Sequence, residues 1–234
     1  MVGWLSGFVR SGVASLFYPQ IVRAVKTDSL TYLDIAALKD LFDAVRELEA
    51  RALEGVLIEA GCALGGSAIV MATAKSTTRA LYVYDVFGMI PAPSEEDGPD
   101  VHARYKVIRD GRSEGLGGKQ YYGYQPDLLG VVKQNFHRHR VAIDANNVHL
   151  VQGLFEETLD VRSPVALAHV DCDWYRPVMT CLQRIEPRII PGGRLVIDDY
   201  GAWSGCRKAV DEYFLDKRNR YDFVKRSRLH VIHR

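Results

Sequence analysis

The alternation of short apolar segments with stretches of helical spacing constrains the fold of this chain more than any other feature. Five segments rich in Val, Leu and Ile have the character of buried strands, at 56–58, 81–84, 148–151, 165–170 and 194–197. Helical patterns lie before, between and after them, at 31–50, from Ser67 to about Lys75, and at about 126–138, 175–187 and 205–215. The last segment, 221–234, alternates enough to form two further short strands. The pattern predicts an α/β fold, with a mostly parallel sheet covered by helices on both faces.

Polar residues gather where these strands end. Right-handed crossovers place every strand-to-helix loop of a parallel sheet on one edge, and ligands bind at that edge. The polar positions that follow a strand are Glu59–Ser67, Asp85, Gly153, Asp171 and Asp198. We therefore expect one ligand site, built from loops that are far apart in the sequence.

Four carboxylates give the clearest indication of chemistry. They come in pairs after two of the apolar segments and are Asp171, Asp173, Asp198 and Asp199. Carboxylates about 4 Å apart repel by roughly 4 kcal/mol at a protein-like effective dielectric, so a cation or a transferred proton is expected among them. Oxygen ligands favour Mg²⁺, Mn²⁺ or Ca²⁺ over zinc, and a fourth carboxylate can act as a general base. The alternative is that one Asp caps a helix and another pairs with Arg176 or Arg207.

A glycine-rich loop follows the first strand. The segment Glu59–Ser67 allows a tight turn and leaves N–H groups free at a helix N-terminus. It lacks the three spaced glycines of a dinucleotide site, and Glu59 suits a ligand with a cationic amino-acid end better than a pyrophosphate. S-adenosylmethionine is such a ligand, and Asp85 at the end of the second strand can accept its ribose hydroxyls. The alternative is a plain strand-to-helix turn.

The segment 88–125 interrupts the alternation with prolines, glycines and tyrosines. A loop of this length in a compact domain is usually functional, often an active-site lid. Its aromatic residues favour partial order over the alternative of a disordered insertion. The aromatic candidates for an acceptor wall are Tyr121, Tyr122, Tyr124, Trp174 and Tyr175.

The composition bounds the remaining possibilities. A chain of 234 residues, 47% of them hydrophobic, suits one domain with an N-terminal extension. A net charge of +1 gives no general attraction to nucleic acid. The cysteines form no CxxC pair and lie in apolar segments, as expected of a cytoplasmic protein without a zinc site. No segment has the length of a membrane span, and no signal peptide is indicated. Near the N-terminus, Thr31 followed by Asp34 resembles a capping box and predicts a helix start.

Taken together, several motifs resemble those of the macrocin O-methyltransferase family, metal-dependent enzymes that methylate sugar hydroxyls on antibiotics. The matching segments are Ile58–Gly61 with Gly65–Gly66, Tyr84–Gly88, Gly153–Leu159, Val170–Tyr175, Pro191–Gly193 and Ile197–Tyr200. The resemblance implies a Rossmann-like class I methyltransferase fold with a seven-stranded sheet. It also implies an N-terminal helical extension at 1–50, a methyltransferase domain at 51–234 with the lid insertion 88–125, and a homo-oligomer, dimer or higher, paired through apolar residues 4–18.

The resemblance also implies roles for individual residues. The S-adenosylmethionine contacts would be Glu59, Gly61, Ser67 and Asp85, with Gln152 and Phe155 near the adenosine. The ligands of Mg²⁺ (or Mn²⁺) would be Asp171, Asp198 and Asp199. Asp173 would be the general base, and the segment 88–125 would cover the acceptor.

The leading hypothesis is Mg²⁺-dependent O-methylation of a sugar hydroxyl, on an antibiotic deoxysugar or on a mannoside or other glycoside of a polysaccharide precursor. The acceptor would be a small molecule or an oligosaccharide. A catechol-like phenol satisfies the same metal geometry. A glycosyltransferase is also compatible with the motifs, because Asp171-x-Asp173 suits a metal bound to a nucleotide diphosphate. From a different class of protein, an inactive cofactor-binding scaffold subunit fits the same sequence.

Overall fold

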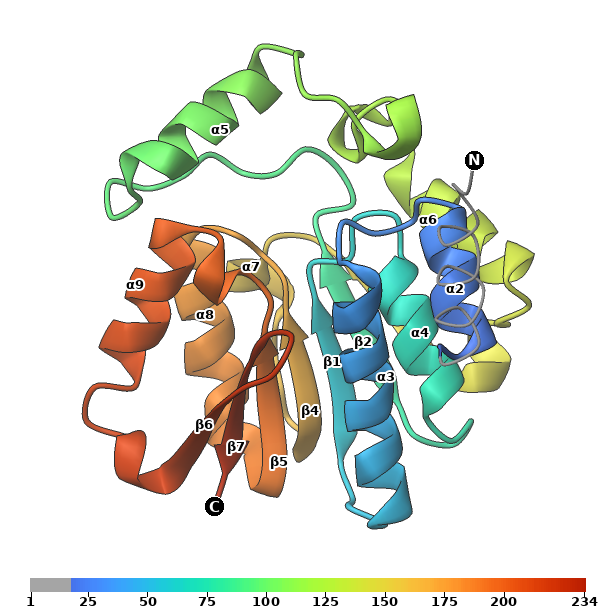
Figure 1. Cartoon of the computed structure of the whole chain (residues 1–234), viewed down its shortest axis with the longest axis vertical. Helices are drawn as coiled ribbons and strands as arrows, with labels where there is room; N and C mark the ends of the chain where they lie inside the picture. Colours follow the sequence, from blue (N-terminus) through green and yellow to red (C-terminus); the bar gives the residue numbers. More distant parts are fainter. Residues whose placement is uncertain (1–17) are drawn as a thin grey trace, which may run out of the picture.

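A seven-stranded sheet forms the centre of the molecule (Figure 1). The computed structural model describes residues 18–234. The strand order is β3-β2-β1-β4-β5-β7-β6. Strand β7 runs in the direction opposite to that of the other six strands. The strands are β1 (Val56–Ala60), β2 (Leu81–Asp85), β3 (Val148–Gln152), β4 (Val165–Val170), β5 (Ile189–Ile197), β6 (Tyr221–Lys225) and β7 (Leu229–His233). All five predicted strands are present, and so are the two short ones near the C-terminus.

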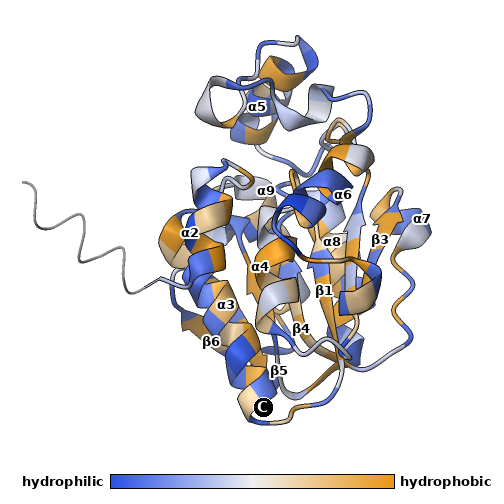
Figure 2. Ribbon diagram, turned by 90° about the vertical axis from the view of Figure 1, so that its right-hand side faces the viewer, coloured by the Kyte–Doolittle hydropathy of each residue, from blue (hydrophilic) through white to orange (hydrophobic). Residues whose placement is uncertain are grey.

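Helices cover both faces of the sheet, as the alternation predicted. They are α2 (Gln20–Thr27), α3 (Ile35–Ala50), α4 (Gly66–Ala74), α6 (Leu128–Arg138), α7 (Phe155–Thr158), α8 (Tyr175–Ile185) and α9 (Ser204–Tyr213), whereas α5 (Pro99–Arg109) lies beyond the ends of the parallel strands. Helices α2, α3, α4 and α6 bury their apolar residues in one core layer, and α8 and α9 bury theirs in the layer on the other face. Figure 2 shows the apolar strands enclosed by helices whose outer faces carry the hydrophilic residues.

Two boundaries differ from the sequence prediction. Helix α3 begins at Ile35, where Asp34 Oδ1 accepts a hydrogen bond from Ala37 N at 2.8 Å. Thr31 is not its cap, because the Thr31 hydroxyl instead accepts from Leu33 N within the preceding turn. Strand β5 begins at Ile189, since the Pro191–Gly193 segment forms an irregularity inside the strand and not the turn before it.

The N-terminal region joins the sheet domain closely in the part that the structure describes. Helices α2 and α3 share one core with α4. The predicted protomer contact at residues 4–18 lies, apart from Tyr18, outside the described residues. None of the helices in the described range combines the length and the apolar character that crossing a membrane requires.

The segment 88–125 is ordered and lies across the edge where the parallel strands end (Figure 1). It contains α5 and the short 3₁₀ turns Leu116–Gly118 and Tyr122–Tyr124. Two aspartates at its start cap helices of the main body. Asp97 Oδ1 accepts from Tyr175 N of α8 at 2.8 Å, and Asp100 Oδ2 accepts from Ser204 N of α9 at 3.0 Å. The segment 88–125, for which the sequence predicted the role of a lid and which keeps that name below, is therefore fastened to the N-termini of α8 and α9.

Arg79, just before β2, connects helix α3 with the turn ahead of β1, at the edge of the sheet away from the segment 88–125. Its Nε lies 2.5 Å from Glu49 Oε1 of α3, and its two terminal nitrogens donate to the backbone carbonyls of Leu53 and Gly55 ahead of β1. Both charged side chains are largely buried, at 11% and 16% exposure. The arginine thus fixes the turn between α3 and the first strand.

We expect Arg79→Ala to lower the free energy of unfolding by about 2–4 kcal/mol, because it leaves Glu49 and two carbonyls without their partner. Arg162→Ala is the matched control, since Arg162 and Asp160 form a surface pair with 84% and 62% exposure, and such pairs contribute about 0–1 kcal/mol. Chemical denaturation of both variants measures the difference. Equal losses in the two variants would contradict the role given to Arg79.

Candidate active site

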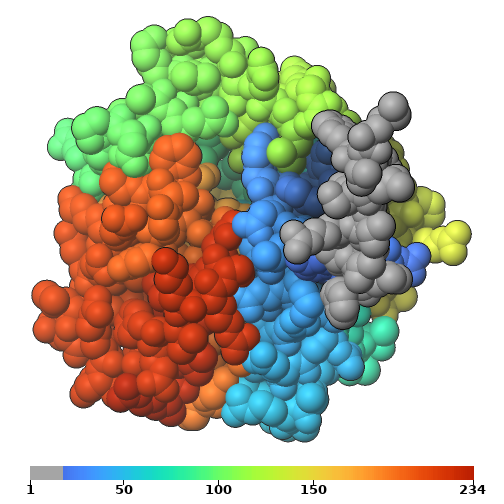
Figure 3. All heavy atoms as spheres, in the orientation of Figure 1, coloured from blue at the N-terminus to red at the C-terminus, as the bar shows by residue number. Residues whose placement is uncertain are grey.

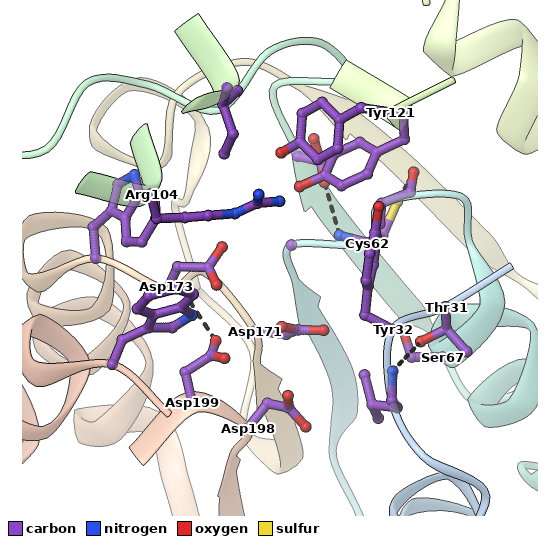
Figure 4. A pocket seen from close by; sticks show the side chains of 18 residues that line it. Thr31, Tyr32, Cys62, Ser67, Arg104, Tyr121, Asp171, Asp173, Asp198 and Asp199 are labelled. Carbon is purple, nitrogen blue, oxygen red and sulfur yellow. Dashed lines mark hydrogen bonds between the residues drawn. The ribbon is translucent and has the colours of Figure 1, made fainter. Parts of the chain in front are cut away.

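Three carboxylates converge at the ends of β4 and β5. Oxygen atoms of Asp171, Asp198 and Asp199 all lie within 4.8 Å of one another. Strand β5 ends at Ile197, so the extended alternation no longer applies and both aspartates that follow turn toward Asp171 (Figure 4). This cluster offers a hard cation three oxygen ligands, as the spacing in the sequence predicted.

The close approach of β1 and β4 sets the position of Asp171. A Cβ on Gly61 would lie 1.8 Å from the Asp171 carbonyl oxygen, and the glycine has φ +89°. Asp171 N donates to Ala60 O at 2.9 Å, which continues the ladder between the two strands. Only glycine permits this contact, so the loop and the carboxylate are placed together.

The cluster carries more negative charge than its surroundings neutralise. Burial, and next the charges of Asp198 and Asp199, hold the pKa of Asp171 well above its ordinary value. Burial likewise raises the pKa of Asp199, and the charge of Asp173 adds to it. Burial alone would also raise the pKa of Asp198, but the nearby His169 ring and the hydrogen bond from Arg228 hold that pKa below its ordinary value. A divalent cation would relieve the repulsion at the first two groups.

The fourth carboxylate lies in the same cavity, outside the group of three. Asp173 has φ +58°, in the left-handed region, and its backbone N–H donates to Asp199 Oδ2 at 3.1 Å. Burial raises the pKa of Asp173 to about 6, helped by the charge of Asp198 and opposed by a hydrogen bond with the Trp203 side chain. The position next to a candidate metal site, with a raised pKa, is suited to a general base.

Glu59 lies beneath the glycine loop and lines neither cavity of the site. Its side chain is 0% exposed, one oxygen accepts from the Ser67 hydroxyl, and the other lies 2.9 Å from His169 Nδ1. His169 Nε2 lies 3.8 Å from Asp198 Oδ1. Glu59 and His169 thus lie buried below the carboxylate cluster, and His169 connects Glu59 to Asp198 of that cluster. The cofactor contact assigned to Glu59 stays a prediction.

Asp85 fastens the glycine loop to the end of β2. Its two oxygens accept hydrogen bonds from Cys62 N and Phe87 N, each at 2.7 Å. The carboxylate lines both cavities, but these backbone contacts already use part of its acceptor capacity. Its contact with a ribose stays a prediction.

Two connected cavities lie between the sheet edge and the lid. One, of about 210 Å³, is bounded by the carboxylates, the turn before α3 and the lid. The other, of about 580 Å³, extends over Gly153 and Phe155 toward α8. The walls that they share are Gly61, Asp85, Tyr122, Asp171 and Asp173. In Figure 3 a hollow is visible below the lid, between the N-terminal and C-terminal parts of the chain.

The predicted wall residues separate into two groups. Those that line a cavity are Gly61, Ser67, Asp85, Phe155, Tyr121, Tyr122 and Trp174. Those that line neither are Gln152, Tyr124 and Tyr175. Gln152 donates to Val86 O, Tyr124 holds the lid together through Ile108 O, and Tyr175 donates to Glu212 on α9.

The sequence interpretation missed several residues of the cavity walls. They are Thr31, Tyr32, Leu33, Arg104, Ile108, Ile90, Pro91, Ala92, Leu154, Arg176 and Trp203. One of them had a usable signal. Val101, Arg104 and Ile108 fall on one face of α5 by helical spacing, and two of these three are buried apolar residues.

Comparison with known proteins agrees with this geometry. A family described as macrocin O-methyltransferase (TylF) matches residues 27–225. The chain belongs to this family. It is 32% identical over 197 residues to the 8-demethyl-8-(2,3-dimethoxy-alpha-L-rhamnosyl)-tetracenomycin-C 4'-O-methyltransferase of Streptomyces olivaceus, covering 82% of this chain and 68% of that protein. It is 27% identical over 189 residues to the mycinamicin III 3''-O-methyltransferase of Micromonospora griseorubida, covering 78% of this chain and 69% of that protein.

The fold has close counterparts among solved structures. The O-methyltransferase NovP superposes with a TM-score of 0.72 at 22% identity, over 87% of this chain and 82% of that one. The predicted class I methyltransferase fold is thereby confirmed. Family membership makes the protein an S-adenosylmethionine-dependent O-methyltransferase, which decides against a glycosyltransferase and against an inactive scaffold.

The repulsion within the cluster makes a prediction about stability. We expect Mg²⁺ at about 100 times its dissociation constant to add roughly 2.7 kcal/mol of stability, which raises the melting temperature by roughly 5–10 °C for a chain of this size. Asp199→Asn should lose most of this response while remaining folded, since an amide oxygen can still accept from Asp173 N.

In the absence of metal, Asp199→Asn should be more stable than the wild type. Because the folded-state pKa of Asp199 lies above the ordinary 3.8, its ionisation penalises the folded wild type increasingly as pH rises above about 4. Thermal denaturation in chelator at pH 4 and pH 8 therefore measures a stability gain that grows with pH. Asp160→Asn on the surface is the control. A variant less stable than wild type at pH 8, or one as responsive to Mg²⁺, would contradict this charge assignment.

Proposed function

We propose that this protein transfers a methyl group from S-adenosylmethionine to a hydroxyl of a sugar, in a reaction that requires a divalent cation, Mg²⁺ or Mn²⁺. The tetracenomycin-C methyltransferase to which the chain is similar acts, by its own description, on a compound that carries a rhamnosyl group. The observation that carries the metal requirement is the convergence of Asp171, Asp198 and Asp199 within 4.8 Å.

The donor set fits a hard divalent cation. Asp171, Asp198 and Asp199 supply carboxylate oxygens without a sulfur ligand, as Mg²⁺ and Mn²⁺ prefer. The raised pKa values of Asp171 and Asp199 mark the charge that such an ion would neutralise. A bound cation would orient acceptor oxygens and lower the pKa of the reacting hydroxyl.

Asp173 acts as the general base. Its carboxylate takes the proton of the acceptor hydroxyl while that oxygen forms a bond to the methyl carbon. The bond between this carbon and the sulfur breaks with its electron pair, which leaves S-adenosylhomocysteine. The hydrogen bond from the backbone N–H of Asp173 to Asp199 Oδ2 holds Asp173 beside the cluster. Alignment of the reacting groups accounts for a large part of the rate, since effective molarities supply roughly 7–11 kcal/mol.

Different parts of S-adenosylmethionine would lie in the two cavities. The larger one, beside Gly153 and Phe155 at the end of β3, suits the adenosine. The methionine end of S-adenosylmethionine would pass Gly61 toward Ser67 and the turn at Thr31. The polar groups of Ser67 and Thr31 line the smaller cavity. The reactive sulfur then lies near the shared wall at Asp171 and Asp173.

The acceptor occupies the part of the smaller cavity below the lid. Trp174 and Trp203 pack edge to face with ring centroids 5.6 Å apart, and Tyr121 and Tyr122 face them from the lid. Aromatic walls suit the apolar faces of a pyranose ring, and the polar groups that line the rest of the cavity suit its hydroxyls. A volume of about 210 Å³ favours a single terminal sugar residue here.

Asp173→Asn tests the assignment of the base. Asparagine tolerates the left-handed backbone at this position, so the loop should keep its shape while the base is lost. We expect kcat to fall by about 10²–10⁴, with the dissociation constant of S-adenosylhomocysteine changed less than about threefold. Steady-state kinetics and calorimetry measure the two quantities. Activity near the wild-type level would exclude Asp173 as the base.

Metal removal tests the cation requirement. Exhaustive treatment with EDTA should abolish methyl transfer, and Mg²⁺ or Mn²⁺ should restore it, whereas added S-adenosylmethionine should not. The assay uses labelled methyl donor with a panel of glycosides and catechol-like phenols. Turnover that persists after chelation would refute the metal requirement, and transfer to phenols alone would refute the sugar acceptor.

A further inference from the structure

Arg104 projects from the lid into the acceptor side of the site (Figure 4). It lies on the face of α5 that also carries Val101 and Ile108, which are 0% and 2% exposed. The helix is held in place one turn earlier, because Asp100 caps α9 through the backbone and hydroxyl of Ser204. The position of the arginine over the cavity is therefore fixed by the packing of the lid.

The guanidinium of Arg104 has only weak partners within the protein. Its Nη2 donates to Ser113 Oγ at 2.9 Å, and its central carbon lies 5.8 Å from the centroid of the Tyr121 ring. Among the described residues it forms no ion pair, although it faces Asp173 across the cavity. Most of its five N–H donors thus remain available on the cavity side.

The other cations near the carboxylates are already used. His169 lies against Glu59, and Arg228 Nε lies 2.6 Å from Asp198 Oδ1. Of the described residues that line the smaller cavity, Arg104 alone carries a permanent positive charge. A half-buried guanidinium binds carboxylates and phosphates in preference to neutral hydroxyls, because two of the anion's oxygens accept parallel charge-assisted hydrogen bonds.

We propose that Arg104 recognises an anionic group on the acceptor, a carboxylate or a phosphate, next to the hydroxyl that is methylated. The acceptor lies in the gap between Arg104 and Asp173, with its hydroxyl toward Asp173 and its oxyanion toward the lid. This inference rests on the proposed sugar O-methylation and narrows its substrate class to acidic or phosphorylated sugars.

The test compares acceptors that differ only in charge. Methyl glucoside, methyl glucuronide and glucose 1-phosphate are assayed with the wild type, Arg104→Gln and Arg109→Gln. Arg109 is the matched control, because it lies on the same helix and pairs with Asp110 at the surface. The wild type should show a kcat/KM at least about tenfold higher for one of the two anionic acceptors. The anionic acceptor with the higher kcat/KM then shows whether Arg104 recognises a carboxylate or a phosphate.

Arg104→Gln should lower kcat/KM for the anionic acceptor by roughly 10- to 100-fold and change that for the neutral glucoside by less than about threefold. Arg109→Gln should leave both unchanged. Equal rates for neutral and anionic acceptors, or equal losses on both in Arg104→Gln, would overturn the inference while the proposed function stands.

A binding measurement keeps the inference testable without turnover. Calorimetry with the same compounds, in the presence of S-adenosylhomocysteine and Mg²⁺, should show binding of one anionic sugar that Arg104→Gln weakens at least about tenfold. Anion binding that does not depend on Arg104 would reject the inference. Absence of methyl transfer to every sugar, with Arg104-dependent anion binding intact, would instead count against the proposed function.

Discussion

Mutual repulsion among the carboxylates at the ends of β4 and β5 is the constraint on which the rest of this site depends. Asp171, Asp198 and Asp199 approach within 4.8 Å, and Asp173 lies beside them. Such a cluster persists only where the surrounding structure holds it by strong local contacts. Gly61 allows β1 to pass directly against Asp171, and the backbone of Asp173 bonds to Asp199. The repulsion among these charges lowers the stability of the folded protein. A bound cation would reduce this loss of stability.

The cations of the protein are distributed so that the cluster is only partly neutralised. Arg228, on the turn between β6 and β7, and buried His169 both act on Asp198. Asp171 and Asp199 have no comparable partner among the described residues, and burial raises their pKa values. This asymmetry leaves Asp198 as the carboxylate whose charge the protein itself stabilises, whereas a bound cation would stabilise the ionised forms of Asp171 and Asp199.

Much of this arrangement could be predicted from the sequence because it follows from strand polarity. Parallel strands end on one edge, so recognising 165–170 and 194–197 as strands placed Asp171 and Asp198 on that edge. They lie close together because the two strands are neighbours in the sheet. The position of Glu59 could not be predicted, because its side chain pairs with Ser67 and His169 below the loop, and sequence spacing does not reveal which buried partner a strand-end carboxylate finds. Arg104 was missed because the segment 88–125 was interpreted as an irregular loop, so the helical spacing of Val101, Arg104 and Ile108 within it was not used. The capping prediction for Thr31 was wrong because Asp34 offers its carboxylate three residues later.

We propose above all that one divalent ion binds carboxylates from two segments far apart in the sequence, Asp171 from one and the adjacent Asp198 and Asp199 from the other. Crystals soaked in Mn²⁺ test it most directly, since anomalous scattering locates the ion without reference to catalysis. The account predicts a single strong peak bounded by oxygens of Asp171, Asp198 and Asp199 at about 2.0–2.3 Å, absent in Asp171→Asn. Full density for the protein with no peak there, or a peak elsewhere that is unaffected by this substitution, would contradict it.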